Sequence, residues 1–156
     1  MPVAHLRVAT PGDDLFLRSV YASTRAEELS VVPWNDEQKR AFTDQQFTAQ
    51  DAYYREHYPT AQFLVIEAGD GPAGRLYVDR WTREIRIMDI ALLPEHRGAG
   101  IGTHLIRELQ AEAQGAGLSL TIHVEKFNPA LRWYERLGFR IAEDKGVYLL
   151  MAWRNP

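Results

Sequence analysis

Cysteine is absent from the 156 residues, and this absence removes several kinds of chemistry at once. The chain has no disulfide framework, no thiolate zinc site and no cysteine nucleophile. It also lacks any apolar run near the roughly 20 residues that a membrane span requires. Its start has no basic segment that leads into an apolar stretch, so we expect no signal peptide. These absences predict a cytoplasmic protein that makes no membrane contact.

A surplus of positive charge is also missing. The formal net charge is −3 at pH 7, which does not fit a nucleic-acid-binding protein. Residues 1–60 hold 6 Lys and Arg against 9 Asp and Glu, whereas residues 61–156 hold 12 of each. The acidic first third favours a cationic partner, or it is simply a solvated helical surface. The 46% hydrophobic and 25% charged residues are typical of one folded domain.

The apolar pattern predicts a mixed α/β (α+β) domain. Helical spacing alternates with short runs of aliphatic and aromatic residues, and three consecutive runs are expected to form an antiparallel meander. The expected order is strand, helix, helix, three strands, helix, strand, helix, strand, strand, at residues 3–8, 10–30, 36–58, 62–68, 74–81, 83–93, 103–114, 118–124, 128–138, 139–142 and 147–153. Turns are expected at residues 69–72 and 144–146.

A glycine-rich loop between a strand and a helix carries the clearest chemical signal. Gly98, Gly100 and Gly102 alternate in it, directly after Arg97. Glycines let the backbone approach a ligand closely and adopt positive φ angles. The helix that follows presents free N–H groups and the positive end of its dipole. The pattern predicts an anion site suited to phosphate, and a tight turn without a ligand is the alternative.

Other phosphate-binding and catalytic motifs are missing. A P-loop has a lysine after its last glycine, whereas Thr103 follows Gly102 here. The dinucleotide fingerprint is G-x-G-x-x-G inside a βαβ unit, and this loop reads G-x-G-x-G after consecutive strands. The five histidines show no close ligand spacing, and there is no G-x-S-x-G elbow. We therefore expect neither a metal site nor a serine hydrolase.

Two motifs together resemble the GCN5-related N-acetyltransferase (GNAT) family. The acyl-CoA loop of that family has the form Arg/Gln-x-x-Gly-x-Gly/Ala, which residues 97–102 match. A later family signature places an Asn after a strand, then a Tyr, then Gly-Phe. Asn128, Tyr134 and residues 138–139 match it in the expected order.

The resemblance implies a single domain over residues 1–156, with a mixed, mostly antiparallel sheet that is splayed at its fourth and fifth strands. It is specific over residues 83–140, the expected acyl-CoA core. Residues 1–60 share only the strand–helix–helix order and would form the acceptor side. The implied activity is that of an N-acetyltransferase, which moves an acetyl group directly from acetyl-CoA to a primary amine without a metal ion.

The use of acetyl-CoA implies a set of binding residues. The loop amides would hold the CoA pyrophosphate, and the Arg97 side chain would add charge. The backbone of the fourth strand would pair with the pantetheine arm like an added strand. Asn128 would hydrogen-bond that arm or cap the next helix. The implied cofactor-binding residues are Ile90, Ala91, Leu92, Arg97, Gly98, Ala99, Gly100, Ile101, Gly102, Thr103, Asn128 and Tyr134.

Acyl transfer to an amine uses a base for the amine proton and an acid for the departing thiolate. The resemblance implies that Tyr134 is the acid, and a core-packing tyrosine is the alternative. The candidate bases are Glu84, Asp89 and His123, in that order. Each also has a structural interpretation: an exposed or ion-paired Glu84, a structural Asp89 or a core His123. Proton loss through a water chain is a further route.

The expected acceptor is a small-molecule or peptide amine. The first two helices, residues 31–34 and Trp81 would select it. Tyr53, Tyr54 and Tyr58 have a helical spacing that fits either a binding surface or a mixed core face. Two other functions remain open: a non-catalytic acyl-CoA-binding or sensor domain, and a nucleotide-binding protein that uses the glycine loop differently. A homodimer through the C-terminal strands also remains open.

Overall fold

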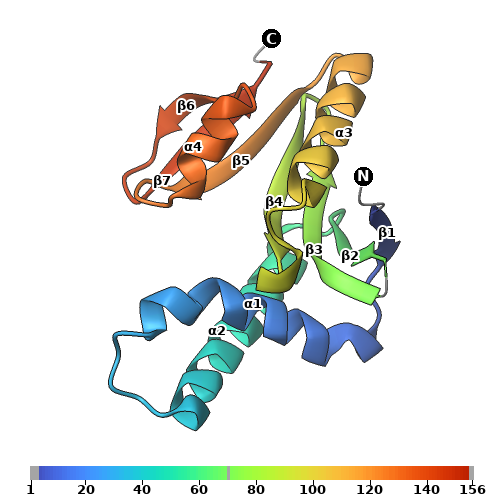
Figure 1. The fold of residues 1–156 in the computed structure, drawn as a ribbon. Helices are drawn as coiled ribbons and strands as arrows, with labels where there is room; N and C mark the ends of the chain where they lie inside the picture. Colours follow the sequence, from blue (N-terminus) through green and yellow to red (C-terminus); the bar gives the residue numbers. More distant parts are fainter. Residues whose placement is uncertain (1–3, 70, 155–156) are drawn as a thin grey trace.

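The computed structural model describes residues 4–69 and 71–154, which form a seven-stranded sheet with helices on both faces (Figure 1). The strand order is β1-β2-β3-β4-β5-β7-β6. Every neighbouring pair is antiparallel except β4 and β5. The elements are β1 (Ala4–Val8), α1 (Asp14–Leu29), α2 (Asp36–His57), β2 (Gln62–Ala68), β3 (Gly71–Arg80), β4 (Glu84–Leu92), α3 (Ile101–Ala116), β5 (Ser119–Glu125), α4 (Ala130–Arg136), β6 (Arg140–Asp144) and β7 (Tyr148–Trp153).

The predicted order of strands and helices is confirmed, and the differences lie at element ends. β3 begins at Gly71, inside the predicted turn, because Gly71 already pairs with the last residue of β2. α3 continues through Gly115 and ends before Gly117, whose φ of 71° closes the helix. The parts of the prediction at Val3 and Asp70 lie outside the described residues.

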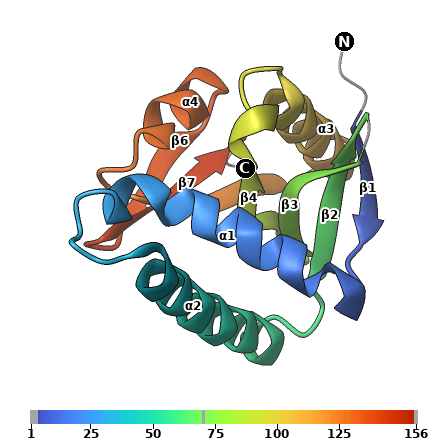
Figure 2. The ribbon, with the colours of Figure 1, turned by 60° about the horizontal axis from the view of Figure 1, so that its bottom comes forward.

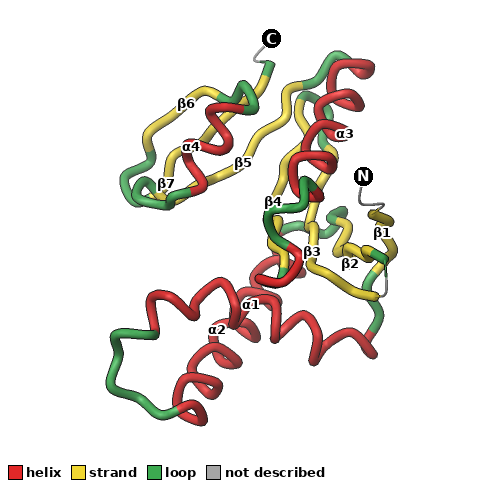
Figure 3. The backbone as a smooth tube through the Cα atoms, in the orientation of Figure 1, coloured by secondary structure: helices red, strands yellow, loops and turns green. Residues whose placement is uncertain are grey.

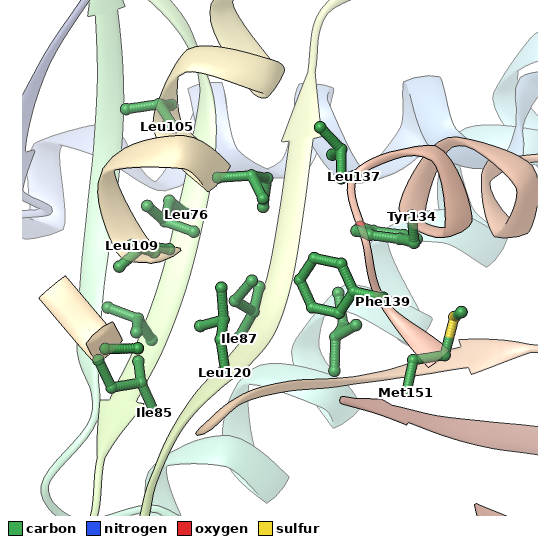
Figure 4. Packing of buried hydrophobic residues seen from close by; sticks show 14 of the residues in the cluster. Leu76, Ile85, Ile87, Leu105, Leu109, Leu120, Tyr134, Leu137, Phe139 and Met151 are labelled. Atoms are coloured by element: carbon green, nitrogen blue, oxygen red, sulfur yellow. The ribbon is translucent and has the colours of Figure 1, made fainter. Parts of the chain in front are cut away.

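Two apolar layers hold the helices on the sheet. α3 and α4 cover one face, and α1 and α2 cover the other (Figure 2). Successive side chains of β2 pack into opposite layers, since Ile66 belongs to the larger cluster and Val65 to the smaller one. Figure 4 shows the larger cluster, in which Leu109 of α3, Ile87 of β4 and Tyr134 of α4 take part.

β4 and β5 pair along only part of their length. Their parallel register joins residues 84–87 to residues 119–122. β4 nevertheless continues to Leu92 and β5 to Glu125, and the two strands diverge (Figures 1 and 3). Residues 89–92 stay paired with β3, but no described strand pairs with them on the other side. The predicted splay is confirmed, and it leaves part of β4 as a free edge.

A bulge in β4 determines which side chains face α1 and α2. Ile87 and Asp89 pair with consecutive residues of β3, so Met88 is an additional residue. Strand side chains alternate between faces, and one extra residue reverses the alternation. Ile85 and Ile87 therefore lie in the larger cluster before the bulge, and Ile90 packs against that cluster after it. Asp89 is left on the face that α1 and α2 cover.

Candidate active site

Two cavities adjoin where β4 and β5 diverge. The loop cavity, of about 960 Å³, is lined by the glycine loop, the end of β4 and the start of α4. The tyrosine cavity, of about 520 Å³, is lined by five tyrosines: Tyr53, Tyr54, Tyr58, Tyr134 and Tyr148. Ile90, Asn128 and Ala130 line both cavities. A molecule bound in the loop cavity can therefore extend towards the tyrosine cavity.

The glycine loop curves around the N-terminal end of α3. Gly98 and Gly100 have φ angles of 78° and 86°, which other residues adopt only with strain. Gly102 lies against Trp133, where an added Cβ would be 3.4 Å from the ring. The first N–H groups of a helix have no acceptor within it, and they lie at the positive end of its dipole. This backbone can hold an anion such as a pyrophosphate.

Most residues predicted to bind the cofactor line the loop cavity. They are Ile90, Ala91, Leu92, Arg97, Gly98, Gly100, Ile101, Gly102, Thr103 and Asn128. Ala99 does not line this cavity, and Tyr134 lines the tyrosine cavity instead. Arg97 is steadied by one hydrogen bond, in which its Nε donates to the Leu92 carbonyl at 2.9 Å. The structure thus brings ten of the twelve predicted residues to the loop cavity, with Tyr134 in the adjoining cavity and Ala99 in neither.

Asn128 lies at the junction of the two cavities. Its Oδ1 accepts a hydrogen bond from the Ala130 N–H at 2.8 Å, so the side chain caps the first turn of α4. Its Nδ2 makes no hydrogen bond with the described residues. The amide can therefore cap the helix with its oxygen and still donate to a ligand with its nitrogen.

Tyr134 belongs to the apolar core and also lines the tyrosine cavity. Its ring centroid lies 5.5 Å from that of Phe139, and its hydroxyl makes no hydrogen bond with the described residues. Burial, and to a smaller extent the charge of Asp89, raises the pKa of this hydroxyl above its usual range. The hydroxyl therefore keeps its proton at neutral pH and remains available as a donor.

Asp89 lines the same cavity, and its carboxylate is held by the buried side chain of Arg75. Its Oδ2 accepts from Nε of Arg75 at 2.5 Å, and Nη2 of Arg75 donates to Oε1 of Gln50 at 2.9 Å. The Arg75 side chain is 2% exposed and that of Asp89 is 28% exposed. A buried guanidinium requires such a partner, because an unpaired charge in the interior is strongly destabilising. The pair fixes the orientation of Asp89 towards the cavity.

Arg86 holds the other two candidate bases. Glu84 accepts from Nη2 of Arg86 at 3.3 Å and also hydrogen-bonds Thr121, and it lines neither cavity. Nη1 of Arg86 lies 3.2 Å from Nδ1 of His123. A guanidinium can only donate, so Nδ1 accepts and the ring proton is on Nε2. The structure thus brings Asp89 and His123 to the cavity and leaves Glu84 outside it.

Burial and then the charge of Arg86 lower the pKa of His123. The ring is therefore neutral at pH 7, with its N–H on the nitrogen that Arg86 does not contact. In this tautomer Nε2 of His123 is a hydrogen-bond donor and cannot accept a proton without a change of tautomer.

Tyr53 and Tyr54 of α2 and Tyr58, which follows it, all line the tyrosine cavity. Tyr54 Oη donates to the Met88 carbonyl at 3.4 Å, which ties α2 to the bulge in β4. The rings of Tyr58 and Trp81 stack at 6.1 Å with an interplanar angle of 13°. Sequence reasoning missed six further polar residues of the lining: Arg25, Gln50, Arg86, Glu125, Lys145 and Tyr148. They come from six different elements or turns, so no local spacing connects them.

Within residues 4–69 and 71–154, no three His, Asp or Glu side chains form a group that could hold a metal ion. No helix in the described part of the chain is long and apolar enough to cross a membrane.

Comparison with known proteins gives the same family as the two motifs. The sequence pattern of the acetyltransferase (GNAT) family matches residues 21–139. Streptothricin acetyltransferase of Streptomyces lavendulae is 33% identical over 105 residues, which cover 64% of this chain and 55% of that protein. A candidate ribosomal protein bS18-alanine N-acetyltransferase of Bacillus subtilis strain 168 is 35% identical over 117 residues, 66% of this chain and 76% of that protein.

Solved structures share the fold over nearly the whole chain. PaiA N-acetyltransferase of Thermoplasma acidophilum, in complex with coenzyme A, has a TM-score of 0.73 at 15% identity and covers 98% of this chain and 99% of its own. An acetyltransferase of Thermus thermophilus has a TM-score of 0.68 at 20% identity, covering 96% of this chain and 95% of its own. The family pattern covers more than half of the sequence, and the chain belongs to the acetyltransferase (GNAT) family.

Proposed function

We propose that this chain is an N-acetyltransferase that moves an acetyl group from acetyl-CoA directly to a primary amine. One observation carries the proposal: a loop cavity suited to an anion adjoins a second cavity that is lined by a protonated tyrosine and a carboxylate. The first cavity suits the pyrophosphate and pantetheine of CoA, and the second suits acid–base chemistry on an amine. The family membership and the coenzyme A complex of PaiA support the choice of cofactor.

The binding mode follows from the loop and the free strand edge. The N–H groups of residues 98–103 hold the pyrophosphate, and Arg97 adds a positive charge beside it. The pantetheine arm lies along residues 89–92 and hydrogen-bonds the unpaired backbone of β4, as an added strand does. Nδ2 of Asn128 donates to the same arm. The thioester then ends near Tyr134.

The reaction breaks one bond and forms one. The amine nitrogen attacks the thioester carbon, a C–N bond forms, and the tetrahedral intermediate collapses with cleavage of the C–S bond. Tyr134 gives its proton to the departing sulfur, and the base takes the proton that the amine loses. The products are the N-acetylated amine and the CoA thiol. The proton on the base returns to the tyrosine oxygen through solvent, so the enzyme regains its starting state.

Asp89 is the base that we favour. It lines the cavity that contains Tyr134, and Arg75 fixes its orientation. Glu84, the first of the three predicted bases, lies in an ion pair outside both cavities, and Nε2 of His123 carries an N–H. The roles of Glu84, His123 and a water chain stay predictions. The pH profile of kcat/KM in Asp89→Asn, Glu84→Gln and His123→Gln tests them, and a profile that none of these variants alters would favour the water route.

Calorimetric titration with acetyl-CoA tests the cofactor, with ATP and NADH as controls. We expect acetyl-CoA alone to bind, followed by CoA release when amines are added. Acetyl-CoA binding without CoA release from a broad amine panel would favour the sensor alternative. A folded protein that does not bind acetyl-CoA would refute the proposal, and binding of ATP or NADH instead would favour a nucleotide-binding protein.

The acceptor that we propose is a small-molecule or peptide amine. The names of the two relatives contain streptothricin and an alanine of ribosomal protein bS18, which we take as examples of acceptors in the family. Homodimer formation and a cytoplasmic location stay predictions.

A further inference from the structure

Cationic side chains outnumber acidic ones on the wall of the tyrosine cavity. The lining includes Arg25, Arg86 and Lys145, against Asp89 and Glu125. The carboxylates that pair with Arg25 and Arg86, Glu28 and Glu84, are not part of the lining. Arg75, the partner of Asp89, is likewise not part of the lining. The lining itself therefore carries three cationic side chains against two carboxylates.

Arg86 is a fixed cation in this wall. Its side chain is 9% exposed, and its Nε donates to Oγ1 of Thr121 at 2.8 Å. Its guanidinium carbon lies 4.9 Å from the ring centroid of Trp81. The side chain is already ordered, so little conformational entropy is lost when a ligand binds to it.

Lys145 and His123 share this cavity wall with Arg86. His123 comes from β5, and Lys145 comes from the turn between β6 and β7. Burial lowers the pKa of His123 most, and the positive charges of Arg86 and then Lys145 lower it further. The negative charges of Glu84 and Glu143 raise this pKa by smaller amounts. Nε2 of the neutral ring carries the N–H. These three side chains, which we call the cationic subsite, all offer N–H groups.

The cationic subsite lies a short distance from the carboxylate that we propose as the base. Arg86 and Asp89 are three residues apart on β4, so at 3.2–3.4 Å per residue their Cα atoms lie within about 10 Å of each other. A molecule that places its amine at Asp89 and its other end at the cationic subsite needs only a few bonds between the two groups. Such a molecule fits in a cavity of about 520 Å³.

We propose that the acceptor is an amine that also carries an anionic group, a carboxylate or a phosphate, and that Arg86, His123 and Lys145 bind this group while the amine lies at Asp89. This inference rests on the proposed function and adds the substrate class. A polycationic amine would place its additional charges against Arg86 and Lys145, which like-charge repulsion disfavours.

Matched pairs of amines test the substrate class. The pairs are 4-aminobutyrate with butylamine, and O-phosphoethanolamine with ethanolamine, and spermidine represents the polycations. We expect kcat/KM of the anionic member to exceed that of its partner by about 10- to 100-fold, the effect of one hydrogen bond between charged groups. The pair with the larger ratio identifies the anion as carboxylate or phosphate. A ratio of one or less in both pairs, or a preference for spermidine, would overturn the inference.

Lys145→Gln tests the cationic subsite in a variant that retains its fold. Lys145 is exposed, and its Nζ makes no hydrogen bond or ion pair with the described residues, so its replacement has little effect on stability. We expect the ratio for the preferred pair to fall severalfold, mainly through KM of the anionic amine. Lys39→Gln is the matched control, because Lys39 lines neither cavity and the change in net charge is the same. Equal effects of the two substitutions would refute a local role.

The titration of His123, followed by NMR in the absence of acetyl-CoA, gives a readout besides activity. A bound anion beside the ring favours its charged form, so 4-aminobutyrate or O-phosphoethanolamine should raise the pKa of His123, whereas butylamine and ethanolamine should not. An unchanged titration with both anionic amines would contradict the inference. If no amine releases CoA, the proposed function fails, and the titration still decides whether the subsite binds anions.

Discussion

Replacing Tyr134 by phenylalanine removes one oxygen atom from the centre of the site. The ring keeps its packing against Phe139 and the rest of the core. The hydroxyl that is lost makes no hydrogen bond with the described residues, so no partner is left unsatisfied. We expect the free energy of unfolding to change by about 0.5 kcal/mol or less. Any loss of activity in this variant therefore reports chemistry and not unfolding.

The expected loss lies in turnover. Proton donation by a positioned side chain contributes about 10²- to 10⁴-fold to rate, which corresponds to about 2.7–5.5 kcal/mol of the activation free energy. The pKa of Tyr134 is raised by burial, so the hydroxyl is protonated over the whole neutral range and acts only when negative charge develops on sulfur. In the proposed binding mode, acetyl-CoA is held by the loop and by β4, at other atoms. We therefore expect kcat to fall by this factor, with little change in acetyl-CoA affinity.

The absence of cysteine makes the assay direct. A thiol reagent detects released CoA without any signal from the protein. Affinity for acetyl-CoA is measured separately by calorimetry. Tyr77→Phe is the matched control, because Tyr77 is also buried and its hydroxyl has no described partner, but it lines neither cavity. Unchanged turnover in Tyr134→Phe, or an equal loss in Tyr77→Phe, would remove Tyr134 from the mechanism.

Three further predictions concern binding and stability. Gly102→Glu puts a carboxylate where the pyrophosphate is proposed to bind and should weaken acetyl-CoA binding about 100-fold, or about 2.7 kcal/mol by calorimetry, whereas Gly115→Glu in the same helix should not. Asp89→Ala leaves a buried guanidinium unpaired and should lower the free energy of unfolding in urea by about 3–5 kcal/mol, more than Arg75→Met, which leaves a carboxylate facing the cavity. Hydrogen bonding to a neighbouring arginine holds the pKa of Asp13 well below its usual range. This carboxylate therefore contributes its full stability above its unfolded pKa of about 3.9, and that stability is lost as the pH falls from there through the lower folded-state pKa. In Asp13→Asn the melting temperature should therefore decrease less at acid pH.

The cofactor side of the site could be predicted because its chemistry is local. Residues 97–102 are consecutive, and alternating glycines before a helix have a direct meaning for backbone geometry. The structure gives Gly98 and Gly100 the positive φ angles that this pattern predicts. The one residue of the loop that lines neither cavity, Ala99, lies between these two glycines, where sequence alone cannot tell which way a side chain turns.

The acceptor side could not be predicted in the same way. Its wall is assembled from α1, α2, β4, β5, α4 and the last turn, and residues as distant as Arg25 and Lys145 share one cavity. Glu84 shows the limit most clearly. Its place on β4 made it the first candidate base, but Arg86 and Thr121 hold it outside the cavity. The position of the Glu84 side chain depends on the pairing between β4 and β5, which joins residues far apart in the sequence.

The bulge at Met88 links the fold to the proposed chemistry. In a regular strand Asp89 would share a face with Ile85 and Ile87, because side chains alternate with a period of two. It would then lie in the apolar layer under α3, where an unpaired carboxylate is strongly destabilising. The additional residue turns Asp89 to the opposite face, where Arg75 is available as its partner.

The same irregularity also coincides with the point where β4 leaves β5. Pairing between the two strands stops at Ile87, one residue before the bulge. The Met88 carbonyl accepts from Tyr54 Oη, so α2 is fixed against the strand at this position. A single extra residue thus accompanies three features that the proposed function needs: a free strand edge for pantetheine, a carboxylate in the cavity and a fixed wall of tyrosines. No local pattern in residues 84–92 marks Met88 as the extra residue, because its identity depends on the register with β3.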